Sequence, residues 1–256
     1  MNDHPWESLE YLRRLAGPGR VVPIEVGSDY RSEDWTQEIM SLDKFLDALN
    51  PVNSDESGIP VLYMAQHSLF RQIPALRDDI NIPDYVYASL PPPSSFPEYR
   101  PPVNAEQLVI NSWLGPAGTM SPAHTDPYYN FYGRFPQSSL VPSLIHLSLA
   151  QVVGRKTVWL APPECTPYMY AHSNSADVAA QSHNPAQNTT EPSMSNTSRV
   201  DVFSQQCNEQ FPAFCEHVVP KAICTTLLPG DLLFFPPGWW HAMRSEDVSF
   251  SVSMWF

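Results

Sequence analysis

One short stretch of this sequence, residues 119–130, places an imidazole and a carboxylate two positions apart. These groups belong to His124 and Asp126, and the residues around them favour an extended strand. Side chains at positions i and i+2 of a strand share one face, so both groups can reach the same point. A facial triad for non-haem Fe(II) needs two such ligands and one further imidazole, and it leaves positions open for a cosubstrate and O2. His241, which follows a Pro-Pro-Gly turn, is the expected third ligand.

Two further charged residues stand in apolar segments. Lys156 interrupts an expected strand over residues 151–160, and Glu25 lies in an apolar segment, residues 21–27, that Pro23 places at a sheet edge. Edge strands use charged side chains for solubility, so both groups could also simply face water.

A histidine considered alone is more often a core residue bonded to a carbonyl than a metal ligand. The order of residues favours a metal site, because His124, Asp126, a strand lysine and a histidine after a Pro-Gly turn all lie in the β-rich half of the chain. An oxygenase that uses Fe(II) and 2-oxoglutarate needs this set of groups.

Composition limits the kinds of protein to which such a site could belong. With 256 residues, 43% hydrophobic and 12% aromatic, the chain can bury a core, and its 28 prolines indicate many stiff turns. The formal charge of -13 opposes nucleic-acid binding and favours a basic protein or peptide partner. Because neither a signal sequence nor a long apolar run is present, we expect no membrane association and a cytoplasmic or nuclear location.

The expected elements divide the chain into two parts that form one structural unit. Residues 1–105 should supply N-terminal helices and flanking strands, and residues 106–256 many short strands between proline and glycine turns. This pattern predicts a mainly β protein with a jelly-roll core, the double-stranded β-helix of cupins. Helices are expected over residues 5–15 and after Ser32 and Ser41, with Trp35 and Ile39 on the buried side of the second. Strands are expected over residues 59–66, 108–114, 151–160, 231–235 and 248–254.

Several motifs of this chain resemble the Jumonji C (JmjC) family of Fe(II)- and 2-oxoglutarate-dependent oxygenases. They are residues 119–126, 154–156, 229–231 with the histidine that follows, and 249–253. Residues 22–28, 64–70, 82–85 and 111–113 extend the resemblance over about residues 21–256 and narrow it to a subfamily that hydroxylates an arginine side chain in a protein.

The resemblance implies a role for each matching residue. His124, Asp126 and His241 would bind Fe(II), with 2-oxoglutarate and O2 as cosubstrates. Lys156 would pair with the distal carboxylate of 2-oxoglutarate, helped by Tyr63, Ser121 and Asn130, which supply the donors that a dicarboxylate needs. Glu25 and Trp35 would hold the substrate guanidinium, with Trp113 and Trp255 as further walls of the pocket.

The chain departs from the family pattern in two places. About seventeen residues near 133–150 separate segments that relatives join, and their removal restores the sequence Asn-Phe-Tyr-x-Gln-Val-Val-Gly-Arg-Lys. We hypothesise that residues 133–150 are translated from a retained intron. Asn130 and Lys156 are expected on one continuous strand, so a one-residue slip there would turn Lys156 away from the pocket. Residues 168–199 are expected to be a disordered surface excursion.

Alternatives remain open at this point. A JmjC histone lysine demethylase or another protein hydroxylase would carry the same metal ligands, and the insertion could leave only a catalytically impaired binding protein. An anionic clamp with a stacking ring suits a planar guanidinium better than a neutral amide, which favours arginine. The oligomeric state is not indicated by the sequence.

Overall fold

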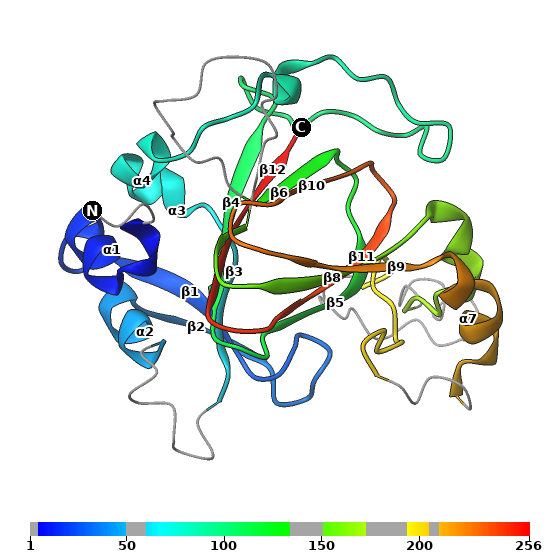
Figure 1. The fold of residues 1–256 in the computed structure, drawn as a ribbon, viewed down its shortest axis with the longest axis horizontal. Coiled ribbons are helices and arrows are strands. Elements are labelled where there is room, and N and C mark those ends of the chain that lie inside the picture. The colour runs from blue at the N-terminus through cyan, green and yellow to red at the C-terminus, as the bar shows by residue number, and fades with distance from the viewer. Residues whose placement is uncertain (1–4, 50–59, 134–150, 173–193, 205–209) are drawn as a thin grey trace, which may run out of the picture.

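Two antiparallel sheets face each other and enclose the centre of the molecule (Figure 1). The structure is a computed structural model and describes residues 5–49, 60–133, 151–172, 194–204 and 210–256. The large sheet has the strand order β10-β6-β12-β4-β3-β1-β2, with β7 also pairing with β12, and the small sheet has the order β5-β11-β8-β9. The predicted mainly β jelly-roll fold is confirmed.

The strands are short, as the turns in the sequence indicate. The large sheet consists of β1 (Val21–Val26), β2 (Thr36–Ser41), β3 (Leu62–His67), β4 (Val109–Gly115), β6 (Asn130–Gly133), β7 (Gln151–Val153), β10 (Leu232–Phe235) and β12 (Ser249–Trp255). The small sheet consists of β5 (Met120–Thr125), β8 (Lys156–Ala161), β9 (Ile223–Leu227) and β11 (Trp240–Ser245).

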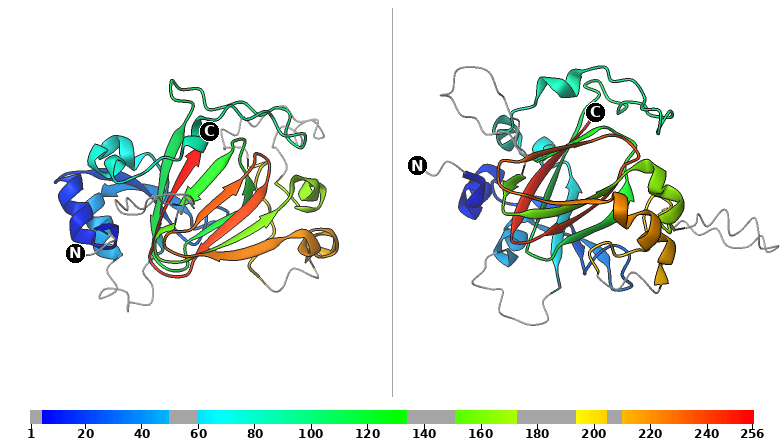
Figure 2. Two further views of the ribbon diagram at one scale, coloured as in Figure 1. Left: turned by 45° about the horizontal axis from the view of Figure 1, so that its top comes forward. Right: turned by 45° about the vertical axis from the view of Figure 1, so that its right-hand side comes forward.

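Helices cover the outer sides of the sheets (Figure 2). Beside the large sheet lie η1 (Pro5–Glu7), α1 (Leu9–Ala16), α2 (Leu42–Ala48), α3 (Leu69–Gln72), α4 (Pro74–Asp78) and η3 (Asp84–Tyr87). Beside the small sheet lie η4 (Pro163–Tyr168), α7 (Pro212–His217) and η5 (Val219–Lys221). None of the described helices is long and apolar enough to cross a membrane.

Strand β12 shows how the alternation in the sequence separates two environments. Phe250, Val252 and Met254 are buried on the outer face, where they join the core formed with the N-terminal helices. The serines between them, at 249, 251 and 253, are also fully buried but face the space between the sheets. A buried hydroxyl needs a polar partner, so this inner face is suited to a polar site.

The helix predicted after Ser41 is confirmed, and the one predicted after Ser32 is wrong. Ser41 accepts a hydrogen bond from the backbone of Lys44 and begins α2, which buries Phe45 and Leu46. The residues after Trp35 instead form β2, which pairs with β1 along its whole length. Pairing with a neighbouring strand outweighs the weak helical preference of so short a segment.

Strand β1 is not the edge strand that Pro23 predicts. It lies between β2 and β3, and β2 forms the edge of the sheet. A proline is tolerated there because β3 pairs only with Glu25 and Val26, so β1 is paired on one side alone at Pro23.

The single strand predicted over residues 151–160 is wrong, because it breaks at Gly154 into two strands that belong to different sheets. Strand β7 pairs with β12, and β8 pairs with β11. Gly154 has a positive φ of 70°, and a Cβ there would lie 2.1 Å from the carbonyl oxygen of Val248. A glycine is therefore required at this corner. Asn130 and Lys156 consequently lie on opposite sheets rather than on one strand.

Strands β6 and β7 lie in line along the same side of β12. Tyr132 pairs with Ser253 and Gln151 with Ser251, so a single residue, Gly133, is needed between them. The hypothetical insertion lies, apart from Gly133, outside the described residues. The register nevertheless shows that removing residues 134–150 would join β6 to β7 without a slip.

The ends of the segment predicted as a disordered excursion are built into the small sheet, which corrects that prediction for the described residues. His124 of β5 forms a bridge with Thr197, and Ser198 forms another with Ala171. The backbone of Asn196 also bonds to Thr125. Residues 196–198 therefore pair with the end of β5, whereas residues 173–193 lie outside the described part of the chain.

Candidate metal and cosubstrate site

The three predicted metal ligands meet at the end of the small sheet. His124 lies directly opposite His241 in the β5–β11 pair, and their rings are 4.2 Å apart. Asp126 follows β5, where its carbonyl accepts a bond from the backbone of Gly238 in the Pro-Pro-Gly turn. The turn that precedes β11 is thus attached to the residue that follows β5. One ligand atom from each of the three side chains lies within 4.8 Å of the others.

Both imidazoles direct the same nitrogen toward the carboxylate. Nε2 of His124 is 3.9 Å from Oδ1 of Asp126, and Nε2 of His241 is 3.4 Å from Oδ2. The Nδ1 atoms lie 2.7 Å from the carbonyl of Pro122 and 3.1 Å from that of Trp239. A carbonyl only accepts hydrogen bonds, so each Nδ1 carries the proton and each Nε2 has a free lone pair.

Electrostatics keeps His124 and Asp126 in the forms that bind a cation. Burial, together with the neighbouring His241, lowers the pKa of His124 to about 4. Burial alone would raise the pKa of Asp126, but the adjacent imidazoles of His241 and His124 outweigh it and hold that pKa below the usual value. Neutral imidazole and ionised carboxylate are the ligand forms that a divalent metal requires. Two imidazoles and one carboxylate also match the donor set preferred by non-haem iron.

Lys156 faces the space between the sheets. Its side chain is 1% exposed, and its Nζ donates to the hydroxyl of Tyr132 at 2.9 Å and of Tyr63 at 3.2 Å. The edge-lysine interpretation is therefore wrong. Burial lowers the pKa of Lys156 to about 7, and no carboxylate of the described residues pairs with it. A buried amine without a carboxylate partner is suited to pair with an anion from outside the chain.

Other predicted cosubstrate residues surround this amine. Tyr63 forms a hydrogen bond with Ser121. Burial raises the pKa of Tyr63, and this hydrogen bond opposes the rise. Gly115 makes room for the Tyr63 ring, since a Cβ there would lie 2.7 Å from it. Asn130 is 2% exposed, and within the described part of the chain its Oδ1 has no hydrogen-bond partner. The hydroxyls of Tyr63 and Ser121 and the Asn130 amide group, through its NH2, are donors of the kind that a dicarboxylate needs.

The four predicted substrate residues divide into two pairs. Glu25 of β1 lies opposite Tyr63, and burial raises the pKa of Glu25 while the nearby indole of Trp35 opposes that rise. Trp113 donates to Ser253 at 2.9 Å, and its ring lies between those of Tyr63 and Tyr132.

Trp255 is the fourth predicted substrate residue, grouped with Trp113. It lies opposite Asn130 and stacks on Tyr128 with ring centroids 5.5 Å apart. Its indole nitrogen is buried without a hydrogen-bond partner among the described residues. Trp255 therefore presents an unused donor at the same sheet position as the unused acceptor of Asn130.

One residue beside Lys156 and one contact near the metal ligands are not predicted from the sequence. Tyr132 makes the shorter contact to Lys156, and its position two residues after Asn130 on a strand could have indicated it. The contact of Tyr30 with Thr197, at 3.3 Å between the hydroxyls, joins segments 167 residues apart and has no local signal.

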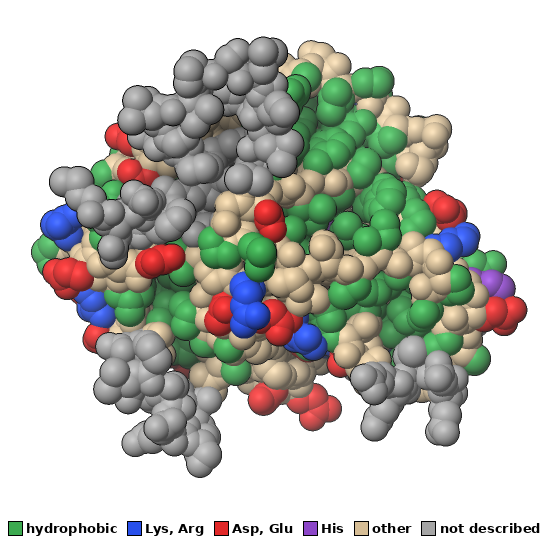
Figure 3. All heavy atoms as spheres, in the orientation of Figure 1, with side chains coloured by type: hydrophobic (Ala, Val, Ile, Leu, Met, Phe, Trp, Pro, Cys, Tyr) green, Lys and Arg blue, Asp and Glu red, His purple; other side chains and the backbone are tan. Residues whose placement is uncertain are grey.

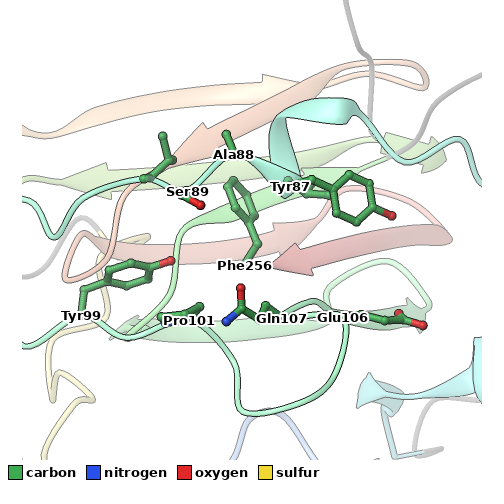
Figure 4. Close-up of a pocket in the computed structure, with 10 residues that line it drawn as sticks. Tyr87, Ala88, Ser89, Tyr99, Pro101, Glu106, Gln107 and Phe256 are labelled. Carbon is green, nitrogen blue, oxygen red and sulfur yellow. The ribbon is translucent and has the colours of Figure 1, made fainter.

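A second hollow of about 300 Å³ lies elsewhere and involves none of these residues. Phe256 stands in its middle, with Tyr87 and Tyr99 on opposite sides (Figure 4). Its lining comes from the loop regions around residues 86–107 and from the chain end. The hollow is thus separate from the candidate metal site.

Comparison with known proteins defines the class first. The chain matches the cupin-like domain family over residues 5–256, and it belongs to that family as a cupin-like JmjC domain.

Individual relatives then specify the branch. The chain is 37% identical to Jumonji C domain-containing protein 5 of Drosophila melanogaster over 99% of its own length and 51% of that protein. It is 36% identical to lysine-specific demethylase 8 of Danio rerio, over 99% of this chain and 49% of that protein. It is 35% identical to lysine-specific demethylase JMJ30 of Arabidopsis thaliana, over 98% and 46%. The chain spans about half the length of these relatives.

Proposed function

We propose that this protein is an Fe(II)- and 2-oxoglutarate-dependent oxygenase that hydroxylates an arginine side chain in a protein or peptide. The observation that carries the proposal is the position of Glu25, which lies opposite Tyr63 and so faces the same space as Lys156. An anionic group beside a cosubstrate site selects a cation, and the indole of Trp35 next to it offers a surface for a planar guanidinium.

The residues of the chain prepare the site for this chemistry. Fe(II), held by His124, Asp126 and His241, would supply oxidation of a C–H bond with O2 and 2-oxoglutarate as cosubstrates. Lys156 would neutralise the distal carboxylate of 2-oxoglutarate, and the hydroxyls of Tyr63 and Tyr132 would keep its amine aimed at that carboxylate. The pocket walls would fix the arginine so that one C–H bond faces the metal.

The charge of the chain suits such a substrate. On the face shown in Figure 3, Lys and Arg side chains occur singly or in small groups among acidic ones, without a continuous basic area. The formal charge of -13 adds a general attraction for basic partners. We therefore propose a basic protein segment, and no nucleic acid, as the partner.

A second candidate activity is removal of a methyl group from lysine, because the names of the relatives from Danio rerio and Arabidopsis thaliana include lysine-specific demethylase. Both activities consume 2-oxoglutarate and form succinate, so succinate alone does not separate them. Glu25 and Trp35 favour arginine, since a guanidinium pairs and stacks at once and an ammonium is a point charge.

The deciding experiment compares two peptide sets with the purified protein, Fe(II), ascorbate and 2-oxoglutarate. One set contains unmodified arginine in many contexts, and the other contains methylated lysine. Mass spectrometry should show a gain of one oxygen atom on arginine and no loss of methyl groups from lysine. Demethylation with unchanged arginine would replace the proposal by the second candidate. No succinate with any peptide would support the impaired binding protein.

A further inference from the structure

The inner face of the large sheet continues past the metal site onto strands β1 and β2. Along β1, Val22 and Ile24 are buried against the N-terminal helices. The alternate residues Val21, Pro23 and Glu25 therefore point to the other face of the sheet. In β2, Ile39 pairs with Pro23, and residues directly opposite each other share a face. Ile39 and Val21 thus lie on the same face as Glu25.

This part of the face is apolar and exposed. The side chain of Val21 is 53% exposed and that of Ile39 is 70% exposed. Single exposed apolar side chains are ordinary, but these two flank Pro23 and lead to Glu25 and then to Tyr63. Val21, Pro23 and Ile39, here called the apolar strip, extend from solvent toward the cosubstrate pocket.

The surroundings of the apolar strip are acidic. Glu33 and Asp34 are exposed in the segment that connects β1 to β2, next to the end of β1 that carries Glu25. Arg31 in that segment is already held by Asp29 through two hydrogen bonds of 3.0 Å, and Arg20, which precedes Val21, donates to the carbonyl of Ala16. An apolar surface with carboxylates beside it complements a polypeptide that carries both apolar and basic residues.

We propose that the apolar strip is the docking surface for the substrate polypeptide and receives an apolar residue close to the target arginine. The inference rests on the proposed function and adds a sequence preference to it. Along a strand, every second residue advances about 6.6 Å, so Pro23 lies about 7 Å and Val21 about 13 Å from Glu25. An extended substrate has the same rise. Its apolar residue should lie two or four positions from the arginine.

The test uses arginine peptides that differ only in this flanking residue. One series carries leucine two or four positions from the arginine, on either side, and the matched series carries serine. The wild-type protein should hydroxylate the leucine series with a kcat/KM about tenfold higher, because part of a leucine side chain leaves water on binding. The difference should lie in KM, since docking precedes the reaction.

Two variants locate the preference and one controls for it. In Ile39→Ser and Val21→Ser the difference between the leucine and serine series should disappear. Both side chains are largely exposed, so folding should be unaffected. Ile223→Ser is the matched control, because Ile223 is 54% exposed on β9 of the small sheet. This control should keep the wild-type preference.

Contrary outcomes separate the docking surface from the proposed function. The docking surface is overturned if the wild type hydroxylates leucine and serine peptides equally well, or if both strip variants still prefer the leucine peptides. The proposed activity stands in both cases. If no arginine peptide is hydroxylated, the proposed function fails. A photo-crosslinker at position 39 then decides docking alone, because labelling of the leucine peptide above the serine peptide supports it and equal labelling refutes it. A dimer that Ile39→Ser dissociates would assign the strip to a second copy instead.

Discussion

The inner face of the large sheet has two parts of opposite character. Where the small sheet covers it, the face carries buried polar residues such as Ser251, Asn111 and Asn130. Beyond the small sheet, on β1 and β2, it carries exposed apolar residues such as Val21 and Ile39. A buried polar group is stable only when it forms hydrogen bonds, and an exposed apolar side chain gains free energy when a bound molecule removes it from water. The covered part is suited to small polar ligands and the open part to a polypeptide.

The largest effect is expected when one of the three metal ligands is removed. In His241→Ala, Fe(II)-dependent formation of succinate should fall by more than about 100-fold, since even partners of metal ligands contribute about 10- to 100-fold. Metal binding, followed by calorimetry with Co(II), should be lost as well. His217→Ala on α7 is the control, because its ring lies against Tyr168 and not in the triad. Full turnover in His241→Ala would refute the assignment of the ligands.

Lys156→Met tests whether the buried amine serves the cosubstrate. Binding of 2-oxoglutarate should weaken by about 10- to 100-fold, because a hydrogen bond to a charged group contributes about 1.5–3 kcal/mol. Binding is measured by calorimetry on the Co(II)-loaded protein. The metal affinity should stay unchanged, and an unchanged affinity for 2-oxoglutarate would remove Lys156 from the pocket.

The same lysine makes stability depend on pH. Its pKa is about 7 in the folded protein, against 10.5 for a lysine side chain in water, so between these values the unfolded chain binds the proton and the folded chain does not. The free energy of unfolding without ligand should therefore rise from pH 7 to pH 9, by up to about 3 kcal/mol. Urea unfolding should show this rise in the wild type and a smaller one in Lys156→Met. Equal slopes would contradict the low pKa.

The ligand should restore the missing proton. At pH 8 the free amine is mostly neutral, and a bound dicarboxylate favours its charged form. Binding of 2-oxoglutarate should then take up close to one proton. Titrations in two buffers with different ionisation enthalpies measure this uptake, and Lys156→Met should show less of it. Uptake that is the same in both proteins would assign the proton to another group.

The smallest expected effect concerns the residues between β6 and β7. A variant lacking residues 134–150 should keep the wild-type succinate formation within about twofold, because Gly133 then precedes Gln151 in the register that β12 already sets. Its free energy of unfolding should not fall, since closing a segment of 17 residues costs about 2.5 kcal/mol of chain entropy.

Deleting residues 133–150 is the matched control, because it removes one residue too many and slips the strand. That control should lose activity. Loss of activity in both deletions would show that residues 134–150 contribute to the site.

The sequence predicted the groups that are close together along the chain better than those that are not. His124 and Asp126 are two residues apart on a strand, so a local rule was sufficient. The corner at Gly154 was missed because it depends on contact with Val248, almost a hundred residues later. The segment that forms β2 has a sequence that favours a helix, but pairing with β1 decides its conformation. The position of Tyr132, two residues after Asn130 on a strand, is a local signal that indicates its role. The bond between Tyr30 and Thr197 has no such signal and follows only from the fold.

The pairing of residues 196–198 with β5 also affects how the sheet ends. Without it, the strand that carries His124 would present free backbone groups, which promote edge-to-edge association of chains. Thr197 and Ser198 cover part of that edge. At the other end of the small sheet, β9 has four exposed residues, beginning with Ile223. Self-association through this sheet should therefore begin at β9, and a charged residue at Ile223 should improve solubility while the metal site remains intact.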